Sequence, residues 1–253
     1  MIKAFQQEIE QADKILVGIG EEFAEQFLKV HSRQEWDELE KQDPLQADIE
    51  RLQYLDRITL EDPVIRAYRN LEKLLSKKDY FIVTTCNDDK IFRSGLNQEK
   101  HIVTPCGTFQ YLQCSNRCND DFLPLSECRG QDISKIRCPG CGEKVTFNKI
   151  SAEHYNEAGY LSQWNEYQQW LTKTLNRKLL VLELGVGFLY PTVIRWPFEK
   201  VVYFNKQAKF YRVNETLYQM TNEIKDKGIS ISQNAVDFLL DITTTNEHMK
   251  LKS

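Results

Sequence analysis

Two closely spaced cysteine pairs constrain the fold of this chain more than any other feature of its sequence. Three residues separate Cys114 from Cys118, and two residues separate Cys138 from Cys141. Pairs at this spacing can supply four thiolates to one tetrahedral zinc ion, with no coordination position left open for a reaction. In the Cys-Pro-Gly-Cys-Gly turn at residues 138–142, backbone N–H groups can point at the sulfur atoms. We therefore predict a structural zinc site.

The alternatives for these four residues are buried free thiols or a redox pair. A redox Cys-x-x-Cys does not need a second cysteine pair, which favours zinc. Residues 104–150, which contain both pairs, have little helical periodicity and read as a small zinc-ribbon module. Zinc binding can contribute about 10–16 kcal/mol to the folding of a module that lacks a large core.

Composition narrows the class of protein. The chain has 253 residues and a formal net charge of -4, which gives no electrostatic basis for binding nucleic acid. No apolar run approaches the roughly 20 residues of a membrane span, and the charged, helix-like start does not resemble a secretory signal. We expect a cytoplasmic protein without a membrane or nucleic-acid partner, in which the cysteines are not a disulfide scaffold.

Apolar segments that end in glycine turns indicate an α/β fold. The run Leu179–Leu184 is continuously apolar apart from Glu183 and leads into Gly185-Val186-Gly187, as a buried central parallel strand would. Similar strand patterns occur at Lys14–Val17, Tyr80–Thr84, His101–Val103, Val201–Phe204, Lys209–Val213 and Ile229–Ile231.

Helical patterns alternate with these strands. They cover Met1–Ala12, Glu21–Leu28, several helices in residues 31–77 that are interrupted near Pro44 and Pro63, Tyr155–Leu175, Glu215–Lys227 and Asn234–Leu240. We predict a Rossmann-type parallel sheet with helices on both faces. Residues 1–103 and 151–253 would form this domain, with a helical insert at about 31–77, and residues 104–150 the zinc module.

Four motifs resemble the sirtuin family. They are the glycine turn at residues 17–21 (Val-Gly-Ile-Gly-Glu), residues 84–88 (Thr-Thr-Cys-Asn-Asp) followed by Gly95, Cys106-Gly107 eight residues before the first zinc cysteine, and Gly185-Val186-Gly187 with Asn214. The likeness covers nearly the whole chain. It is closest to the macrodomain-linked class M branch, notably at residues 109–115, 137–142 and 183–199.

The resemblance implies that NAD is the ligand. Its pyrophosphate would lie over Gly18 and Gly20, at a helix N-terminus. The other implied contacts are Thr84 in the second motif, Asp88 near the nicotinamide ribose, Gly185 and Gly187 near the ribose or adenosine, and Asn214 on the adenosine part. The plainer alternatives are a turn or cap aspartate for Asp88, a tight turn for Gly185 and Gly187, and a strand-end cap for Asn214.

Four departures from the sirtuin motifs bear on the chemistry. Glu21 and Glu22 follow the glycine turn, where their charges would repel a pyrophosphate placed in the same spot, and the family's Gly-Ile-Pro-Asp-Phe-Arg loop has no counterpart. Cys86 replaces the asparagine of the second motif, with Asn87 adjacent. Cys106 stands where deacylases have a histidine, and an ordinary thiol is a poor base near neutral pH. Both thiols can alternatively be small buried hydrophobic residues.

Class M sirtuins also lack this histidine, and they are associated with ADP-ribosyl transfer to a lipoyl-carrier protein. We therefore expect NAD-dependent ADP-ribosyl transfer to an acceptor protein, or NAD cleavage, with Asp88, Cys106 and Asn87 as candidate catalytic residues. The alternatives are a catalytically inactive sirtuin-like protein that binds a nucleotide or a partner, and an NAD-dependent protein deacylase. A thiol-nucleophile enzyme that uses Cys106 is a more remote hypothesis.

Overall fold

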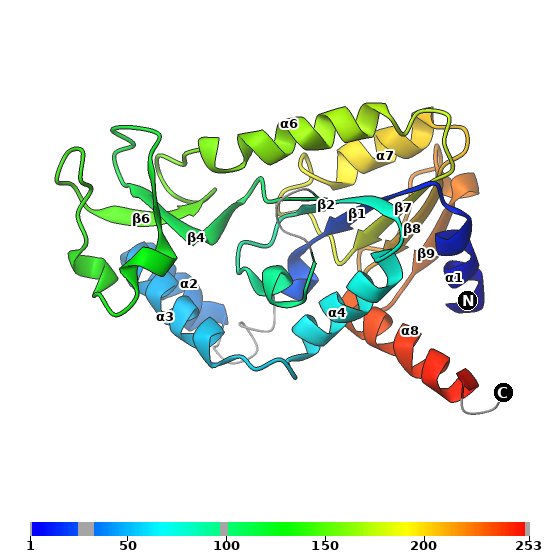
Figure 1. The fold of residues 1–253 in the computed structure, drawn as a ribbon, viewed down its shortest axis with the longest axis horizontal. Helices are drawn as coiled ribbons and strands as arrows, with labels where there is room; N and C mark the ends of the chain where they lie inside the picture. The colour runs from blue at the N-terminus through cyan, green and yellow to red at the C-terminus, as the bar shows by residue number, and fades with distance from the viewer. Residues whose placement is uncertain (1, 25–32, 97–100, 251–253) are drawn as a thin grey trace.

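The protein is built around a parallel sheet of six strands in the order β3-β2-β1-β7-β8-β9 (Figure 1). The structure, a computed structural model, describes residues 2–24, 33–96 and 101–250. The strands of this main sheet are β1 (Lys14–Ile19), β2 (Asp79–Thr84), β3 (Ile102–Val103), β7 (Leu179–Leu184), β8 (Lys209–Val213) and β9 (Gly228–Ile231).

Both faces of the main sheet are buried, which explains why its strands are nearly continuous runs of apolar residues. Along β1, Ile15 and Val17 enter one hydrophobic cluster, whereas Leu16 between them enters the cluster on the opposite face. Successive side chains of a strand point to opposite faces, so a strand covered on both sides is apolar at nearly every position.

Helices cover the two faces as separate layers (Figure 1). On one face lie α6 (Ala158–Thr172) and α7 (Arg195–Phe204), and on the other α1 (Ile2–Gln11), α4 (Pro63–Leu75) and α8 (Ala235–Lys250). The predicted parallel sheet with helices on both faces is confirmed. Within the described residues, no helix is long and apolar enough to cross a lipid bilayer.

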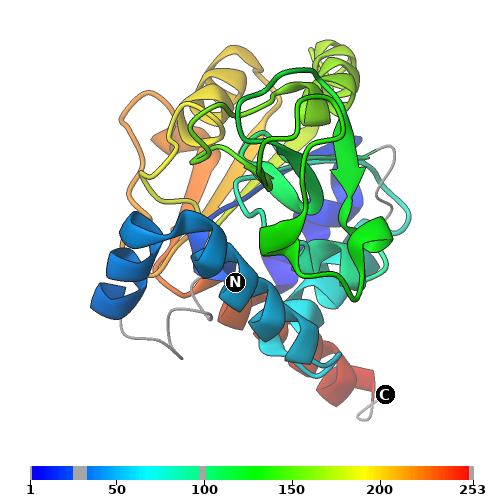
Figure 2. The same cartoon turned by 90° about the vertical axis from the view of Figure 1, so that its left-hand side faces the viewer.

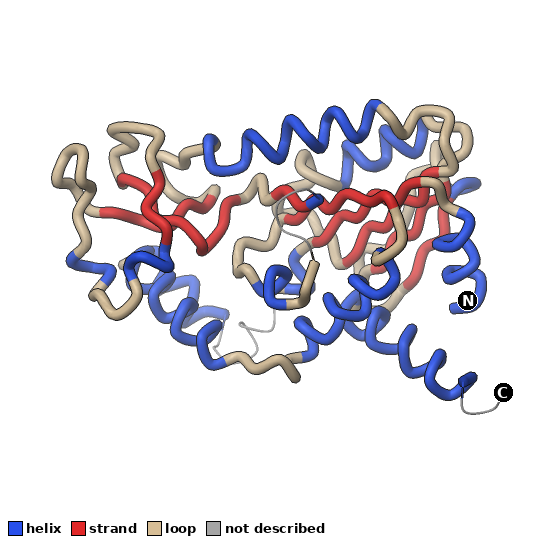
Figure 3. Tube along the Cα trace, viewed as in Figure 1, coloured by secondary structure: helices blue, strands red, loops and turns tan. Residues whose placement is uncertain are grey.

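A second, smaller antiparallel sheet in the order β5-β4-β6 lies apart from the first, as the red strands of Figure 3 show. Its strands are β4 (Gly107–Cys114), β5 (Phe122–Pro124) and β6 (Val145–Lys149). It packs against α3 (Pro44–Arg57), which follows α2 (Arg33–Gln42), through a cluster that includes Phe109, Leu112 and Phe147 from the sheet and Ile49 and Leu52 from the helix. Figure 2 shows these helices directly beside the small sheet.

Two prolines that interrupt the helical pattern are the first residues of helices. Pro44 begins α3 and Pro63 begins α4, where a missing backbone N–H has no consequence. In each case the preceding aspartate accepts a hydrogen bond from the first turn: Asp43 from the Gln46 N–H, and Asp62 from the Val64 N–H. The interruptions predicted near both prolines therefore coincide with helix starts.

Two predicted elements are wrong. Val201–Phe204 is the end of helix α7 rather than a strand, because Arg195, Phe198 and Val202 are buried at helical spacing. Glu215–Lys227 is not a helix: most of it is irregular, with one short 3-10 turn at Lys225–Lys227. Of the helix predicted at Glu21–Leu28, Glu21–Phe23 forms a 3-10 turn, and the segment from residue 25 lies outside the described residues.

Candidate functional site

The four zinc-ligand candidates lie together at one end of the small sheet. Their sulfur atoms are all within 4.8 Å of one another, and the Cys114–Cys141 and Cys118–Cys138 sulfur atoms are 3.5 Å apart. A tetrahedral zinc with Zn–S bonds of about 2.3 Å places its sulfur ligands about 3.8 Å apart. The donor chemistry and the spacing of these cysteines therefore fit one structural zinc ion.

The second site lies at the point where the order of the main sheet reverses. β1 pairs in register with β2 on one side and with β7 on the other, so Ile19 and Leu184 end side by side. Open α/β sheets bind their ligands in the crevice at the carboxyl ends of such strands. By this position in the fold alone, we refer to the end of the sheet between the 3-10 turn η1 (Glu21–Phe23) and the turn at residues 185–189 as the crevice.

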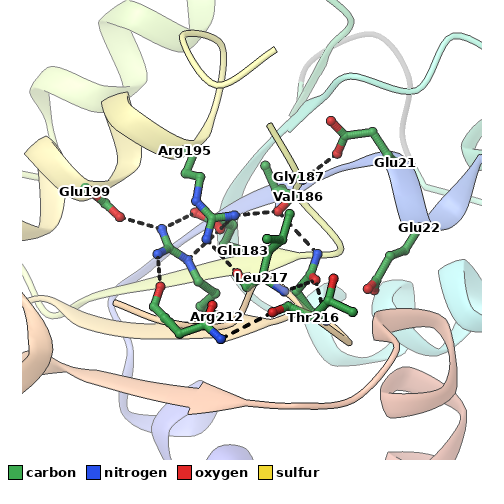
Figure 4. Close-up of polar contacts among 12 residues, drawn as sticks. Glu21, Glu22, Glu183, Val186, Gly187, Arg195, Glu199, Arg212, Thr216 and Leu217 are labelled. Carbon is green, nitrogen blue, oxygen red and sulfur yellow. Dashed lines mark hydrogen bonds and ion pairs between the residues drawn. The ribbon is translucent and has the colours of Figure 1, made fainter. Parts of the chain in front are cut away.

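Glu21 joins these two turns (Figure 4). Its Oε2 accepts a hydrogen bond from the Gly187 N–H at 2.5 Å, and its Oε1 accepts one from the Leu189 N–H at 3.2 Å. The side chain is only partly buried. The two N–H donors therefore hold a carboxylate in one orientation at the switch point of the sheet.

Glu22 points away from the Gly187 turn (Figure 4) and has a structural role. Its two carboxylate oxygens accept hydrogen bonds from the Glu215 N–H at 2.8 Å and from the Ala235 N–H at 2.7 Å, and its side chain is buried. Ala235 is the first residue of α8, where a negative charge is favourable. Glu22 thus connects the 3-10 turn after β1 to the loop after β8 and to the start of α8.

The two glycines of the predicted phosphate turn are required by packing. A Cβ atom on Gly20 would lie 2.4 Å from the Cα of Val186, so the turns after β1 and β7 could not approach as they do. A Cβ atom on Gly18 would meet the side chains of Ile194 and Phe198. A contact between these glycines and a pyrophosphate stays a prediction.

The remaining predicted nucleotide contacts are held by neighbouring backbone. Gly185 has a φ of 63°, a conformation that favours glycine. Asn214 is buried: its Nδ2 donates to the Val186 carbonyl, and its Oδ1 accepts from the Thr216 and Leu217 N–H groups. Thr84 is also buried, and its hydroxyl accepts from the N–H of residue 86 at 3.0 Å. Their roles toward a nucleotide stay predictions.

Asp88, the predicted catalytic carboxylate, is buried and paired. Its Oδ2 lies 3.2 Å from the Lys90 Nζ, and the exposed fractions of the two side chains are 3% and 0%. Lys90 also donates to the Phe23 carbonyl at 3.2 Å, so the ammonium group bridges the loops after β1 and β2. Asn87 is partly buried, and its carbonyl accepts from the Phe109 N–H at 3.0 Å.

The two thiols at the sirtuin catalytic positions are buried and neutral. Burial raises the pKa of Cys106 to about 12, with a further contribution from the negative charge of Glu21. Burial, helped by the charge of Asp88, also raises the pKa of Cys86 far above its usual range, and its thiol donates to the Gly20 carbonyl at 3.2 Å. Neither thiol is poised to act as a base or as a nucleophile.

A network of buried charged side chains lies next to the turn at residues 185–189 (Figure 4). Arg212 on β8 binds the Glu183 carboxylate of β7 through two hydrogen bonds of 2.7 and 3.0 Å, and a third of 2.7 Å goes to Glu199 on α7. Arg195 lies 3.6 Å from Glu183, and its guanidinium donates to the Val186 carbonyl at 2.8 Å. The network thereby fixes the turn whose N–H groups hold Glu21.

A cavity lies on the side of the Asp88 loop that faces α3, and Asp88 itself is among its lining residues. Its volume is about 660 Å³, and it is bordered by α3, by the start of β4 and by residues 124–133. Asp89 lines it in a left-handed backbone conformation (φ 59°) and accepts a hydrogen bond from the Thr108 hydroxyl at 2.6 Å. Burial raises the pKa of Asp89 to about 8.

Sequence reasoning missed the partners of these groups. Glu183 interrupts an apolar run and signals a buried charge, but the arginines that bind it lie 12 and 29 residues further along the chain. Nothing in the sequence showed which partner each of Glu21 and Glu22 binds. Lys90, two residues after Asp88, was the available signal that the aspartate has a partner.

Comparisons with solved structures identify the fold. The chain aligns with a Sir2 enzyme at a TM-score of 0.60 and 18% identity, covering 98% of each chain. Sir2Tm bound to a propionylated peptide aligns at 0.60 and 14%, with 97% and 98% covered, and a Sir2–p53 peptide–NAD+ complex at 0.59 and 13%, with 98% and 99% covered. The chain therefore has the sirtuin fold, as its motifs predicted.

Two curated proteins are similar to the chain in sequence. It is 26% identical to the "Protein ADP-ribosyltransferase" of Staphylococcus aureus strain Mu50, over 95% of this chain and 88% of that protein. It is 32% identical to a "Probable bifunctional ADP-ribose hydrolase/ADP-ribosyltransferase" of Fusarium oxysporum f. sp. cubense, over 58% of this chain and 28% of that protein. No protein-family model matches the chain.

The carboxylate at the crevice fits the ribose groups of NAD better than its phosphate groups. A carboxylate held by two backbone N–H groups keeps free lone pairs, so Glu21 can accept hydrogen bonds from ribose hydroxyls. The same charge repels phosphate oxygens. The residues present at the switch point therefore fit a ribosyl group.

Proposed function

We propose that this protein transfers ADP-ribose from NAD to a protein acceptor. The sirtuin fold and the relatives named ADP-ribosyltransferase support this proposal. One observation favours transfer over deacylation: the residue in the position of the deacylase histidine is Cys106, a buried thiol whose pKa of about 12 keeps it protonated. Deacylation in this family needs a base at that position, whereas breaking the nicotinamide–ribose bond does not.

The proposed reaction breaks the bond between the nicotinamide nitrogen and the ribose carbon. The bonding electron pair leaves with the nicotinamide, and a lone pair of the acceptor forms the new bond to carbon. The protein must orient the two substrates, exclude water and place negative charge near the ribose, where positive charge develops. The protein acceptor could be a lipoyl-carrier protein, and a cytoplasmic location belongs to the same proposal.

A specific observation favours a second candidate, a catalytically inactive nucleotide-binding or partner-binding protein. The Asp88 carboxylate, the predicted catalytic group, is matched by the Lys90 ammonium 3.2 Å away and is sealed from solvent. A carboxylate whose charge is balanced in this way contributes little to stabilising positive charge on a substrate.

The test uses zinc-loaded protein, NAD labelled in its adenylate phosphate, and three acceptors in parallel. These are a lipoylated carrier protein, the same carrier without lipoate, and an acetylated peptide. We expect nicotinamide release with label on the lipoylated carrier. Label on both carriers would support transfer but refute the lipoyl preference.

The same assay separates the alternatives. Deacetylation of the peptide would indicate the deacylase. A saturable thermal shift with NAD and no nicotinamide release with any acceptor would support the inactive binding protein. If NAD produces neither a thermal shift nor nicotinamide release, every NAD-dependent function is excluded.

A further inference from the structure

The crevice contains a carboxylate better placed for this chemistry than Asp88. We propose that Glu21 contacts the ribose of NAD and stabilises the positive charge that develops there as nicotinamide leaves. This inference rests on the proposed transferase function. Under this proposal Glu21, rather than Asp88, is the catalytic carboxylate.

The position of Glu21 is the first argument. Glu21 directly follows Gly20, whose carbonyl accepts a hydrogen bond from the Cys86 thiol at 3.2 Å. In keeping with this position, the negative charge of Glu21 makes a minor contribution to the raised pKa of both Cys86 and Cys106. These are the positions at which the sirtuin motifs place the asparagine and the histidine of the reaction centre. The charge of Glu21 also contributes to the raised pKa of the Tyr190 hydroxyl, on the loop that follows Gly187. Glu21 is therefore central to the candidate site.

The second argument is the way the carboxylate is held. Each oxygen accepts one hydrogen bond from the backbone, from the N–H groups of Gly187 and Leu189, on a turn that Arg195 fixes through the Val186 carbonyl. A carboxylate that is already oriented needs no reorganisation during the reaction, which is how electrostatic catalysis is most effective. The lone pairs that remain can accept ribose hydroxyls.

Neighbouring carboxyl groups are less suitable. Asp88 is buried against Lys90, and Glu22 is buried against the N–H groups of residues 215 and 235. Asp89 lines the cavity beside α3, and burial raises its pKa to about 8. Glu21 is the one of these four that combines partial exposure with a place at the switch point.

The chemistry balances without any further reagent. The ribose–nitrogen bond breaks and its electron pair goes to nicotinamide, which leaves as a neutral molecule. The acceptor's lone pair then forms the bond to the ribose carbon, and the proton that the acceptor loses is taken up by the Glu21 carboxylate and passed to water. Glu21 is not consumed.

Activity measurements on two variants test the proposal. Glu21→Gln removes the charge, and Glu21→Asp keeps the charge but withdraws it by one methylene. We expect kcat for nicotinamide release to fall about 10²-fold or more in Glu21→Gln, with a smaller fall in Glu21→Asp and little change in KM for NAD. Glu10→Gln, on exposed α1 at the opposite end of β1, is the matched control and should retain wild-type rates.

The outcomes distinguish this inference from the proposed function. If wild-type protein releases no nicotinamide with any acceptor, the proposed function fails and Glu21 has no reaction to catalyse. If wild-type protein is active and Glu21→Gln is equally active or faster, the function stands and the Glu21 proposal is overturned. A faster Glu21→Gln variant would mean that the Glu21 carboxylate competes with the substrate for the N–H groups of the turn at residues 185–189.

A binding readout on the wild type covers the case in which Glu21→Gln does not fold. The amide resonances of Gly187 and Leu189 report their hydrogen bonds to Glu21. On titration with NAD, both should keep their hydrogen-bonded chemical shifts while other crevice resonances move, because the carboxylate stays in place beside the ribose. Loss of those bonds as NAD binds would show that the substrate displaces Glu21, and would refute the proposal.

Discussion

The main sheet buries apolar side chains against helices on both of its faces, whereas the small sheet has one modest apolar cluster and four cysteines that fit a zinc ion. The main sheet can therefore also accommodate a buried ion network between β7, β8 and α7. The main sheet is stabilised by hydrophobic burial on both faces, whereas the small sheet has a smaller core and a cysteine cluster that a zinc ion would stabilise.

The largest expected effect is the loss of zinc. Removing the metal with a chelator, or replacing Cys138 with serine, takes away about 10–16 kcal/mol of binding free energy. We expect hydrogen exchange to accelerate throughout β4, β5 and β6 while the amides of β1 and β7 stay protected. Equal loss of protection in both sheets would show that the small sheet does not unfold separately.

The next effect concerns the main sheet. Arg212→Met leaves the fully buried Glu183 carboxylate without its main partner, so the free energy of unfolding should fall by about 3–5 kcal/mol. Urea unfolding measures the change, with Arg177→Met at an exposed position as the control. A loss below about 1 kcal/mol would mean that Arg195 alone compensates for the charge.

The smallest effect is at the junction between the two regions. Because the pKa of Asp89 is raised to about 8 in the folded state from an ordinary value of 3.8, the folded state holds this proton more tightly, and stability falls as the pH rises from about 4 to 8. Asp89→Asn keeps the Thr108 hydrogen bond and tolerates the left-handed backbone. It should raise the Tm at pH 7.5 by at least about 2–4 °C, which corresponds to about 1 kcal/mol and is a lower bound for a pKa shift of this size.

The control for Asp89→Asn is the same measurement at pH 4.5, where the change in Tm should be close to zero. The charged groups that act on Asp89 are Asp88, Arg93 and Arg51. Asp48 and Glu183 also have raised pKa values from burial, so a slope of the same sign will remain in the variant. An equal gain in Tm at both pH values would indicate an effect unrelated to the proton.

Features that depend on local sequence could be predicted. The cysteine spacing placed four sulfur atoms in one cluster, and the runs at Leu179–Leu184 and Lys209–Val213 are strands. Val201–Phe204 was mispredicted because its valines and aromatic residues favour strands, while the packing partner that selects the helix, the main sheet, is distant in the chain.

The site was only partly predictable for the same reason. The motifs located the turns at the carboxyl ends of β1 and β7, but the partner of each charged group depends on contacts across the fold. Glu21 and the Gly187 turn are brought together only in the folded chain, whereas Lys90 lies two residues from Asp88 in the sequence. The long-range partners of Glu183 could not be read from sequence either.

The place of β1 in the main sheet has a consequence for synthesis on the ribosome. Lys14 pairs with Asp79 on one side and with Leu179 on the other, and the ring of Phe5 packs against Tyr211. At about 5–20 residues per second, roughly 10–30 s pass between synthesis of β1 and synthesis of β7. During that interval one edge of an apolar strand is exposed, so we expect chaperones to bind the nascent chain before β7 emerges, and the crevice to be among the last parts to form.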